Sequence, residues 1–220
     1  SAEINHVPLL IKVAKTKKPI ILSIGLADLK NIKFALKILR NNGCSKIAIL
    51  QCVSAYPAPL NEQNLKTIKN IKDKFKVVSG LSDHSIGIGS AIASLVLGGS
   101  IIEKHFNLDG KMKTVDSFFS LDVKNFRKMV KEIRSTESAL GKVSYDITTS
   151  SKKNLNSKRS IYVSKKINKG DKISQYNVKV VRPSFGLHPK FYNKILGKKV
   201  SKTLSEGSRF KLNYISNKKN

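Results

Sequence analysis

The sequence has no apolar run of the roughly 18 residues that a membrane-spanning helix needs. Its first residues, SAEINHVPLLIKVAKTKKP, form neither a basic-then-apolar signal peptide nor a transit sequence. We therefore expect a cytoplasmic protein with no membrane partner. The chain begins with Ser1 and not with methionine, which suggests a piece of something longer.

Cysteine is also scarce, with only Cys44 and Cys52 in 220 residues. Both lie in or beside a segment predicted to be buried, so we expect two reduced core thiols and no disulfide. No cysteine or histidine spacing typical of a zinc finger is present. The cysteines by themselves indicate no catalytic role.

Acidic residues are few: 14 Asp and Glu face 42 Lys and Arg, for a formal net charge of +28. Such a charge is typical of nucleic-acid binding through phosphate neutralisation. Here, however, lysine is spread along every helical pattern, without a dense basic arm or an aromatic-basic RNA motif. We favour a solvated surface that attracts an anionic small-molecule substrate, and we keep nucleic-acid binding as a lesser alternative.

The pattern of elements alternates strands with helices. Four buried strands are predicted at Pro19–Ile24, Lys46–Cys52, Val77–Leu81 and Ser100–His105. Helical patterns begin near Asp28, Asn61, Ile86 and Asp122, and an opening helix covers Val7–Lys15. This order predicts an α/β fold with a parallel sheet, either doubly wound or part of a (β/α) barrel.

The repeat ends near Gly141, which predicts a boundary between two domains. We expect a first domain at 1–142, a polar linker at 143–157 that is rich in Ser, Thr, Asn and Lys, and a small domain of short strands and turns at 158–220.

In parallel α/β folds, ligands bind at the carboxyl ends of the strands. Polar side chains gather there: Ser23, Ser54, Tyr56, Ser82, Asp83, His84, Glu103 and His105. Adjacent strands lie roughly 4.8 Å apart, so His84 and His105 can converge on one ion. Two imidazoles plus oxygens suit Mn²⁺, Mg²⁺ or Co²⁺ better than structural zinc. The alternative of two merely hydrogen-bonded histidines stays open on spacing alone.

The run GIGSAI follows the third strand and invites a dinucleotide-binding interpretation. The third glycine of that fingerprint is replaced by Ile92, and the usual acidic residue after the next strand is missing. We therefore favour small residues that allow a helix to pack closely on its strand.

Five separated motifs carry a resemblance that covers nearly the whole chain: LQCVSAYPAPLNEQNL, GLSDHSIGIG, GSIIEKHFNLD, VDSFFSLD and VRPSFGLHPKFYNKILGKK. Together they resemble the nonulosonic (sialic) acid synthase family, most closely its pseudaminic acid branch. The resemblance implies the C-terminal half of a (β/α)₈ TIM barrel followed by an antifreeze-like (SAF) domain. It also implies a domain-swapped homodimer that condenses phosphoenolpyruvate with an N-acylated amino sugar, releases phosphate and binds a divalent metal.

The resemblance assigns roles to individual residues. His84 and His105 match the metal-binding histidines. Ser1, Ser23 and Ser82 match phosphate-binding serines, although strand-end capping would be their ordinary role. Glu3 matches an acidic position proposed to handle protons or water. Tyr56 and Asp116 match positions that contact the sugar. Arg182 matches the arginine that the small domain extends to the sugar's acyl group.

Departures from the family pattern limit these expectations. Ile24 stands where threonine is frequent, and KMKTVD lacks the glycine-rich approach to Asp116. The first four barrel strands are missing, so we expect the chain alone to be poorly stable and inactive. Ser54 favours the pseudaminic acid branch, with an N-acetylneuraminate or legionaminate synthase as the alternative. A non-catalytic carbohydrate-binding or dimerising module is the alternative from another class.

Overall fold

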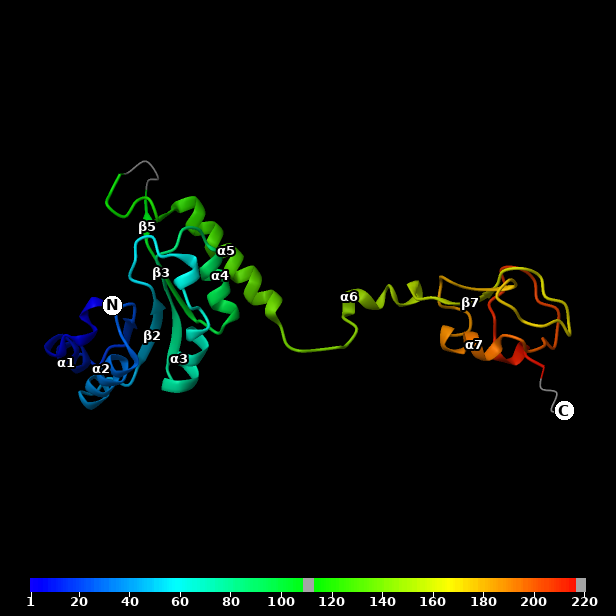
Figure 1. Cartoon of the computed structure of the whole chain (residues 1–220), viewed down its shortest axis with the longest axis horizontal. Helices are drawn as coiled ribbons and strands as arrows, with labels where there is room; N and C mark the ends of the chain where they lie inside the picture. Colours follow the sequence, from blue (N-terminus) through cyan, green and yellow to red (C-terminus); the bar gives the residue numbers. More distant parts are fainter. Residues whose placement is uncertain (109–112, 217–220) are drawn as a thin grey trace. The chain divides into compact units, whose positions relative to one another are not determined.

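The computed structural model describes residues 1–108 and 113–216. It divides into two compact units, Ser1–Lys142 and Val143–Asn220 (Figure 1). In the described residues, no helix is both long enough and apolar enough to cross a membrane.

The first unit is built on a parallel four-stranded sheet in the order β1-β2-β3-β4. Its strands are β1 (Ile20–Ser23), β2 (Ile47–Cys52), β3 (Val78–Asp83) and β4 (Ile101–Lys104). Each lies within two residues of its predicted bounds. The predicted α/β fold class is confirmed, because sequential strands pair in parallel and a helix precedes or follows each one.

The helices of this unit are α1 (Val7–Lys15), α2 (Leu29–Asn41), α3 (Thr67–Phe75), α4 (Gly89–Val96) and α5 (Val123–Leu140). Two helices begin one residue after their predicted starts at Asp28 and Asp122, and the structure makes these two residues the N-caps. Helix α3 begins six residues later than the predicted Asn61, because the short 3₁₀ helix η2 (Leu60–Glu62) and a left-handed Asn64 come first. The predicted start of α4 at Ile86 is three residues early.

The two faces of the sheet are unequally covered in the described part of the chain. Register places Leu22, Ile49 and Ser79 in one row, and Ile49 is fully buried. The adjacent row sits on the opposite face and contains Ile21 and Val78, which are 56% and 48% exposed. A parallel sheet is normally covered on both faces.

The small residues in α4 and just before it have two different roles. Ala91 and Ser94 are fully buried, which agrees with the predicted close packing of this helix. The glycines do not serve that purpose, because a Cβ atom at Gly87 or Gly89 would meet nothing within 4 Å. Gly87 instead has a φ of +86°, which a glycine adopts without steric cost in the turn leading into the helix.

The short elements of the first unit are η1 (Ala2–Asn5), β5 (Phe106–Asn107) and β6 (Leu121–Asp122). The last two pair in parallel beyond the end of β4. They bring the segment that carries Asp116 and Phe119 back toward His105, since Leu121 N–H donates to the His105 carbonyl.

The second unit has an antiparallel pair, β7 (Ser160–Val163) and β8 (Val178–Val181), joined by isolated bridges to later segments. Phe210 and Ile161 are fully buried in its own apolar core. Its short helices are η4 (Pro189–Phe191), α7 (Tyr192–Ile195) and η5 (Leu212–Tyr214). The predicted linker at 143–157 is not wholly irregular, because it contains α6 (Thr149–Lys152) and η3 (Leu155–Ser157).

Candidate active site

The candidate site lies at the carboxyl ends of the strands, on the face of the sheet that also carries Ile21 and Val78. Cys52, Ser82 and Glu103 are neighbours in register across β2, β3 and β4. Ser82 Oγ donates a hydrogen bond of 2.7 Å to Glu103 Oε1. His84 and His105 follow two residues after Ser82 and Glu103, so the alternation of side chains places both histidines on this same face.

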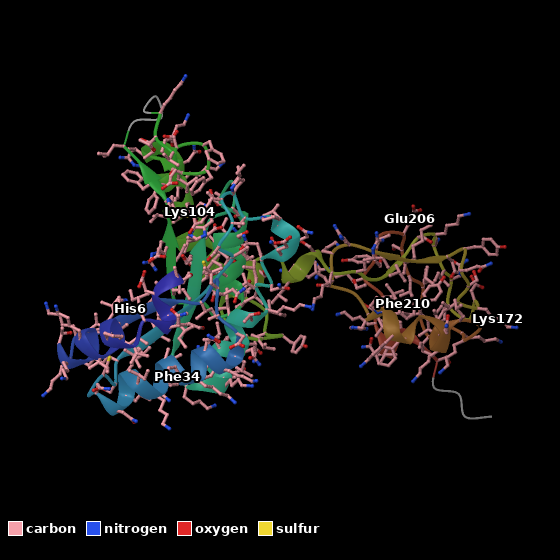
Figure 2. The ribbon with its side chains drawn as sticks, turned by 60° about the vertical axis from the view of Figure 1, so that its left-hand side comes forward. His6, Phe34, Lys104, Lys172, Glu206 and Phe210 are labelled. Carbon is pink, nitrogen blue, oxygen red and sulfur yellow. The ribbon has the colours of Figure 1, made fainter. Side chains whose placement is uncertain are left out.

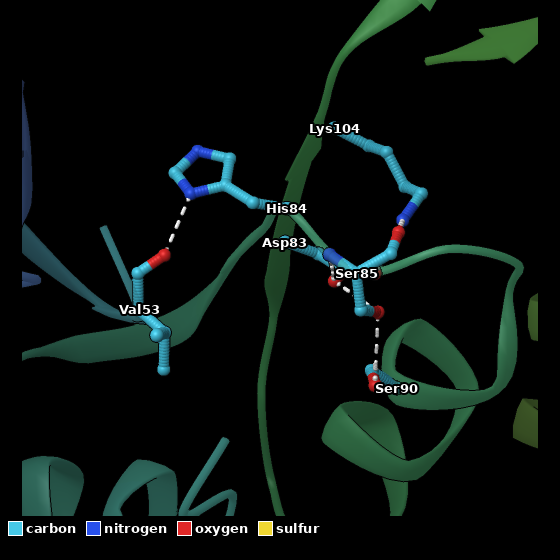
Figure 3. Close-up of polar contacts among 6 residues, drawn as sticks. All are labelled: Val53, Asp83, His84, Ser85, Ser90 and Lys104. Atoms are coloured by element: carbon cyan, nitrogen blue, oxygen red, sulfur yellow. Dashed lines mark hydrogen bonds and ion pairs between the residues drawn. The ribbon is translucent and has the colours of Figure 1, made fainter. Parts of the chain in front are cut away.

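The two histidine rings lie side by side, with centroids 5.3 Å apart. His84 Nδ1 lies 2.8 Å from the Val53 carbonyl oxygen (Figure 3). A carbonyl can only accept, so Nδ1 carries the proton and Nε2 keeps its lone pair in the neutral ring. His105 Nδ1 similarly lies 3.5 Å from Asp116 Oδ2. Such partners on Nδ1 are typical of metal-binding histidines, whose ring orientation they hold.

Aromatic rings border the histidine pair. The ring centroid of Tyr56 is 4.3 Å from that of His84 and 5.9 Å from that of His105. Phe119 packs between Tyr56 and His105, at 5.5 Å and 4.8 Å. Burial raises the pKa of Tyr56, and negative charge on Cys52 adds to this effect. The phenol therefore stays protonated and can donate a hydrogen bond to a ligand near the histidines.

Cys52 is a member of this cluster that the sequence reasoning missed. Its Sγ lies 3.8 Å from His84 Nδ1 and accepts a 3.5 Å hydrogen bond from Ser1 Oγ. Burial alone would raise its pKa, but the contacts with His84 and Ser1 outweigh burial and lower it to about 7. Burial opposes charge on His84, yet the bonds to Cys52 and the Val53 carbonyl raise its pKa. The sequence feature that could have indicated Cys52 is its position as the last residue of a predicted strand.

A second polar group surrounds the end of β1. Ser1 Oγ lies 2.9 Å from Ser23 Oγ and accepts a 3.0 Å hydrogen bond from Gly25 N–H. Ser54 Oγ is buried and has no hydrogen-bond partner among the described residues. A Cβ atom at Gly25 would lie 2.2 Å from Ser54 Oγ and 2.9 Å from Cys52 Sγ, so a larger residue there would displace these side chains.

The structure leaves the predicted roles of Glu3 and Arg182 untested. Glu3 lies on η1, is exposed, and places its Oε2 3.1 Å from His6 Nδ1. Arg182 belongs to the second unit, directly after β8. Their roles stay predictions.

The donor set fits a catalytic ion better than a structural one. His84 and His105 offer two imidazole nitrogens on one face, with Glu103 in the register row just below them. Among the described residues, no three His, Cys, Asp or Glu side chains are arranged to hold an ion by themselves. Two protein ligands leave coordination positions for water or substrate, whereas a structural zinc site normally uses four protein ligands.

Residues 1–145 match the model of the NeuB family, and residues 158–211 match the SAF domain. The chain belongs to the NeuB family. This confirms the family that the sequence motifs indicated, and with it the barrel-type first part and the SAF-type second part of the predicted fold.

Similar NeuB-family proteins include the pseudaminic acid synthase of Campylobacter jejuni, which is 44% identical over 96% of this chain and 62% of its own length. The N,N'-diacetyllegionaminic acid synthase of the same species is 40% identical over 94% of this chain and 63% of its own. The crystal structure of the spore coat polysaccharide biosynthesis protein SpsE of Bacillus subtilis is 32% identical, covers 99% of this chain and 66% of that one, and gives a TM-score of 0.60. The chain thus spans about 62% of the length of the first relative.

Proposed function

We propose that this chain carries the metal- and sugar-binding part of a nonulosonic acid synthase of the pseudaminic acid type. Such an enzyme condenses phosphoenolpyruvate with a 2,4-diacetamido-2,4,6-trideoxy hexose and releases phosphate. The observation that carries the proposal is the pair of histidines at the ends of β3 and β4, each with Nδ1 next to an oxygen and Nε2 left for a ligand.

In this proposal, His84 and His105 hold a divalent ion, Mn²⁺, Mg²⁺ or Co²⁺, and orient the sugar aldehyde. The bound ion would supply Lewis-acid polarisation of the aldehyde oxygen. C3 of phosphoenolpyruvate then forms a bond to the aldehyde carbon, water adds at C2, and the C2–O bond to phosphate breaks. Tyr56 and Phe119 limit the access of solvent to the reacting carbons on one side of the histidines.

The hydroxyls at the end of β1 support a phosphate subsite. Ser1 Oγ lies within hydrogen-bonding distance of both Ser23 Oγ and the Gly25 N–H. Hydroxyl and amide donors of this kind bind phosphate oxygens without adding charge. Ser82, predicted for the same role, donates to Glu103 and would have to turn its hydroxyl to join them.

The remaining assignments concern the sugar. Asp116 and Tyr56 lie beside the histidines and face the position of the aldehyde. Ser54 has a buried hydroxyl with no partner among the described residues, which a ligand hydroxyl or phosphate could satisfy. Glu3 as a proton-handling residue and Arg182 as the contact with the acyl group of the sugar complete the proposed set.

The choice of sugar is supported by similarity alone. The C. jejuni pseudaminic acid synthase is 44% identical to this chain, and the legionaminic acid synthase of that species is 40% identical. A legionaminate or N-acetylneuraminate synthase is therefore the runner-up, because one pocket substitution can change the sugar without changing the chemistry. Phosphate release from phosphoenolpyruvate with each sugar separates the alternatives.

The proposed ion site is tested by Mn²⁺ binding to the whole chain in isothermal titration calorimetry. We expect His84→Ala to abolish binding, because one imidazole alone holds the ion weakly. His6→Ala is the matched control: His6 is exposed and its ring pairs with Glu3, so Mn²⁺ affinity should not change. Equal Mn²⁺ binding by wild type and His84→Ala would contradict the proposal.

A homodimer in which the second unit of one copy covers the site of the other is part of the same proposal. Light scattering of the whole chain measures the assembly, and a monomer at all concentrations would contradict it. The non-catalytic module makes the opposite prediction for metal: glycan binding that is indifferent to Mn²⁺ and to His84→Ala would favour that alternative.

A further inference from the structure

Directly behind the two histidines lies a buried ion pair. Lys104, the last residue of β4, and Asp83, the last residue of β3, are neighbours in register. Lys104 is labelled in Figure 2, and Figure 3 shows it beside Asp83. Lys104 Nζ lies 2.8 Å from Asp83 Oδ2, and the two side chains are 1% and 0% exposed. Surface ion pairs in the same chain, such as Lys69–Asp73, are more than half exposed.

The pair is the centre of a wider polar network. Asp83 Oδ1 accepts the N–H of Ser85 at 2.8 Å and its hydroxyl at 2.7 Å, and Lys104 Nζ donates to the Ser85 carbonyl. Ser85 Oγ lies 3.2 Å from Ser90 Oγ in α4. The Ser85 hydroxyl is therefore shared between two acceptors, Asp83 Oδ1 and Ser90 Oγ. The network therefore joins the ends of β3 and β4 to the first turn of α4.

The network holds the backbone on both sides of His84. Asp83 precedes His84, Ser85 follows it, and both are bonded in the network. Lys104 likewise precedes His105. Since successive side chains point to opposite faces of a strand, Asp83 and Lys104 lie behind the sheet while the histidines lie in front of it. Any shift between the two strand ends would break a bond of the buried pair.

Stability alone does not explain such a pair. Removing two charges from water costs several kcal/mol per ion, and well-packed apolar residues often serve as well or better. A fully satisfied polar network does, however, permit only one arrangement of the groups it joins. Two metal ligands on different strands, such as His84 and His105, require a fixed geometry between their strands.

We propose that Lys104 and Asp83 are positioning residues that set the separation and orientation of the His84 and His105 rings for a shared ligand. The purpose of this positioning rests on the proposed ion site. The positions of the two rings can nevertheless be measured without any metal. Neither residue contacts the ligand itself.

The test uses the whole chain with the double variant Asp83→Asn/Lys104→Met, which removes both charges at nearly constant size and leaves no unpaired buried charge. We expect this variant to fold. The ring signals of His84 and His105 should shift in metal-free ¹H–¹³C NMR spectra, and the affinity for Mn²⁺ should fall by about 10-fold or more. Lys69→Met is the matched control, since it breaks an exposed pair and should move neither readout.

A second control separates positioning from general destabilisation. Leu39→Ala opens a cavity in the apolar core of the first unit, where Leu39 is fully buried, and should lower the melting temperature without moving the histidine signals. A folded double variant with unshifted ring signals would overturn the inference, and so would a double variant that does not fold, because the pair would then be structural. Wild-type protein that binds no Mn²⁺ would refute the ion site, while the ring signals still decide the positioning role.

Discussion

At the residue scale, the contact between Cys52 and His84 changes the properties of both side chains. The thiol would be an ordinary buried cysteine if it stood alone, and the sequence reasoning treated it as one. In the structure it lies beside an imidazole and a serine hydroxyl that favour the thiolate. Its pKa is lowered to about 7 as a result.

We therefore predict that Cys52 titrates near neutral pH in the metal-free chain. The thiolate fraction should rise as pH increases through about 7, which the ¹³Cβ shift of Cys52 in NMR reports. His84→Ala removes a hydrogen bond and a nearby positive charge that both favour the thiolate, so the midpoint should move to higher pH. Cys44, which is buried and whose Sγ contacts the Lys18 and Lys46 carbonyls, is the internal reference. An unchanged midpoint in His84→Ala would refute this account.

Residue-scale reasoning from sequence found the two histidines because each ends a predicted strand at the ligand-binding edge. It also placed Tyr56 and Asp116 near them through the family resemblance. It could not find Phe119 or the Val53 carbonyl, because their role depends on which atoms approach the rings. The importance of Lys104 was hidden for the same reason, since a lysine in a lysine-rich sequence gives no signal of burial.

At the scale of elements, the helices that follow Asp28 and Asp122 begin where the sequence predicts. Asp122 Oδ1 accepts a 2.7 Å hydrogen bond from Asn125 N–H, which satisfies one of the free amides in the first turn of α5. Helix α3 begins later than predicted, and it has no side-chain cap that a sequence pattern could reveal.

We predict that Asp122→Ala lowers the free energy of unfolding by about 1 kcal/mol, because the cap is lost and the negative charge is removed from the helix N-terminus. Urea denaturation followed by circular dichroism measures the change. Asp122→Asn keeps the hydrogen-bond acceptor and should cost less than Asp122→Ala. An equal loss for both variants would show that charge, and not the cap, is the stabilising factor.

At the scale of the whole molecule, the sheet presents an apolar face that the described residues leave partly exposed. Ile21 and Val78 lie on this face and are about half exposed. The chain also spans about 62% of the length of its C. jejuni relative. An open apolar face and unpaired edge strands at β1 and β4 both reduce stability.

We predict that the isolated chain has low stability and no measurable turnover. Its folded state should bind an apolar fluorescent dye, and Ile21→Ser combined with Val78→Ser should reduce the dye signal. Val143→Ser is the control, because Val143 is 91% exposed but belongs to the second unit. Robust phosphate release from phosphoenolpyruvate and sugar by this chain alone would refute the prediction.

The sequence by itself determined the alternation of strands and helices, the capped helix starts, the position of the two histidines at strand ends, and the family. These follow from local periodicity, from single capping residues and from motifs that are read in order. Only the tertiary structure decided that Cys52 meets His84, that the Val53 carbonyl selects the His84 tautomer, and that Lys104 is buried against Asp83. The partners in these contacts lie 21 to 32 residues apart, and only the register of parallel strands brings them together.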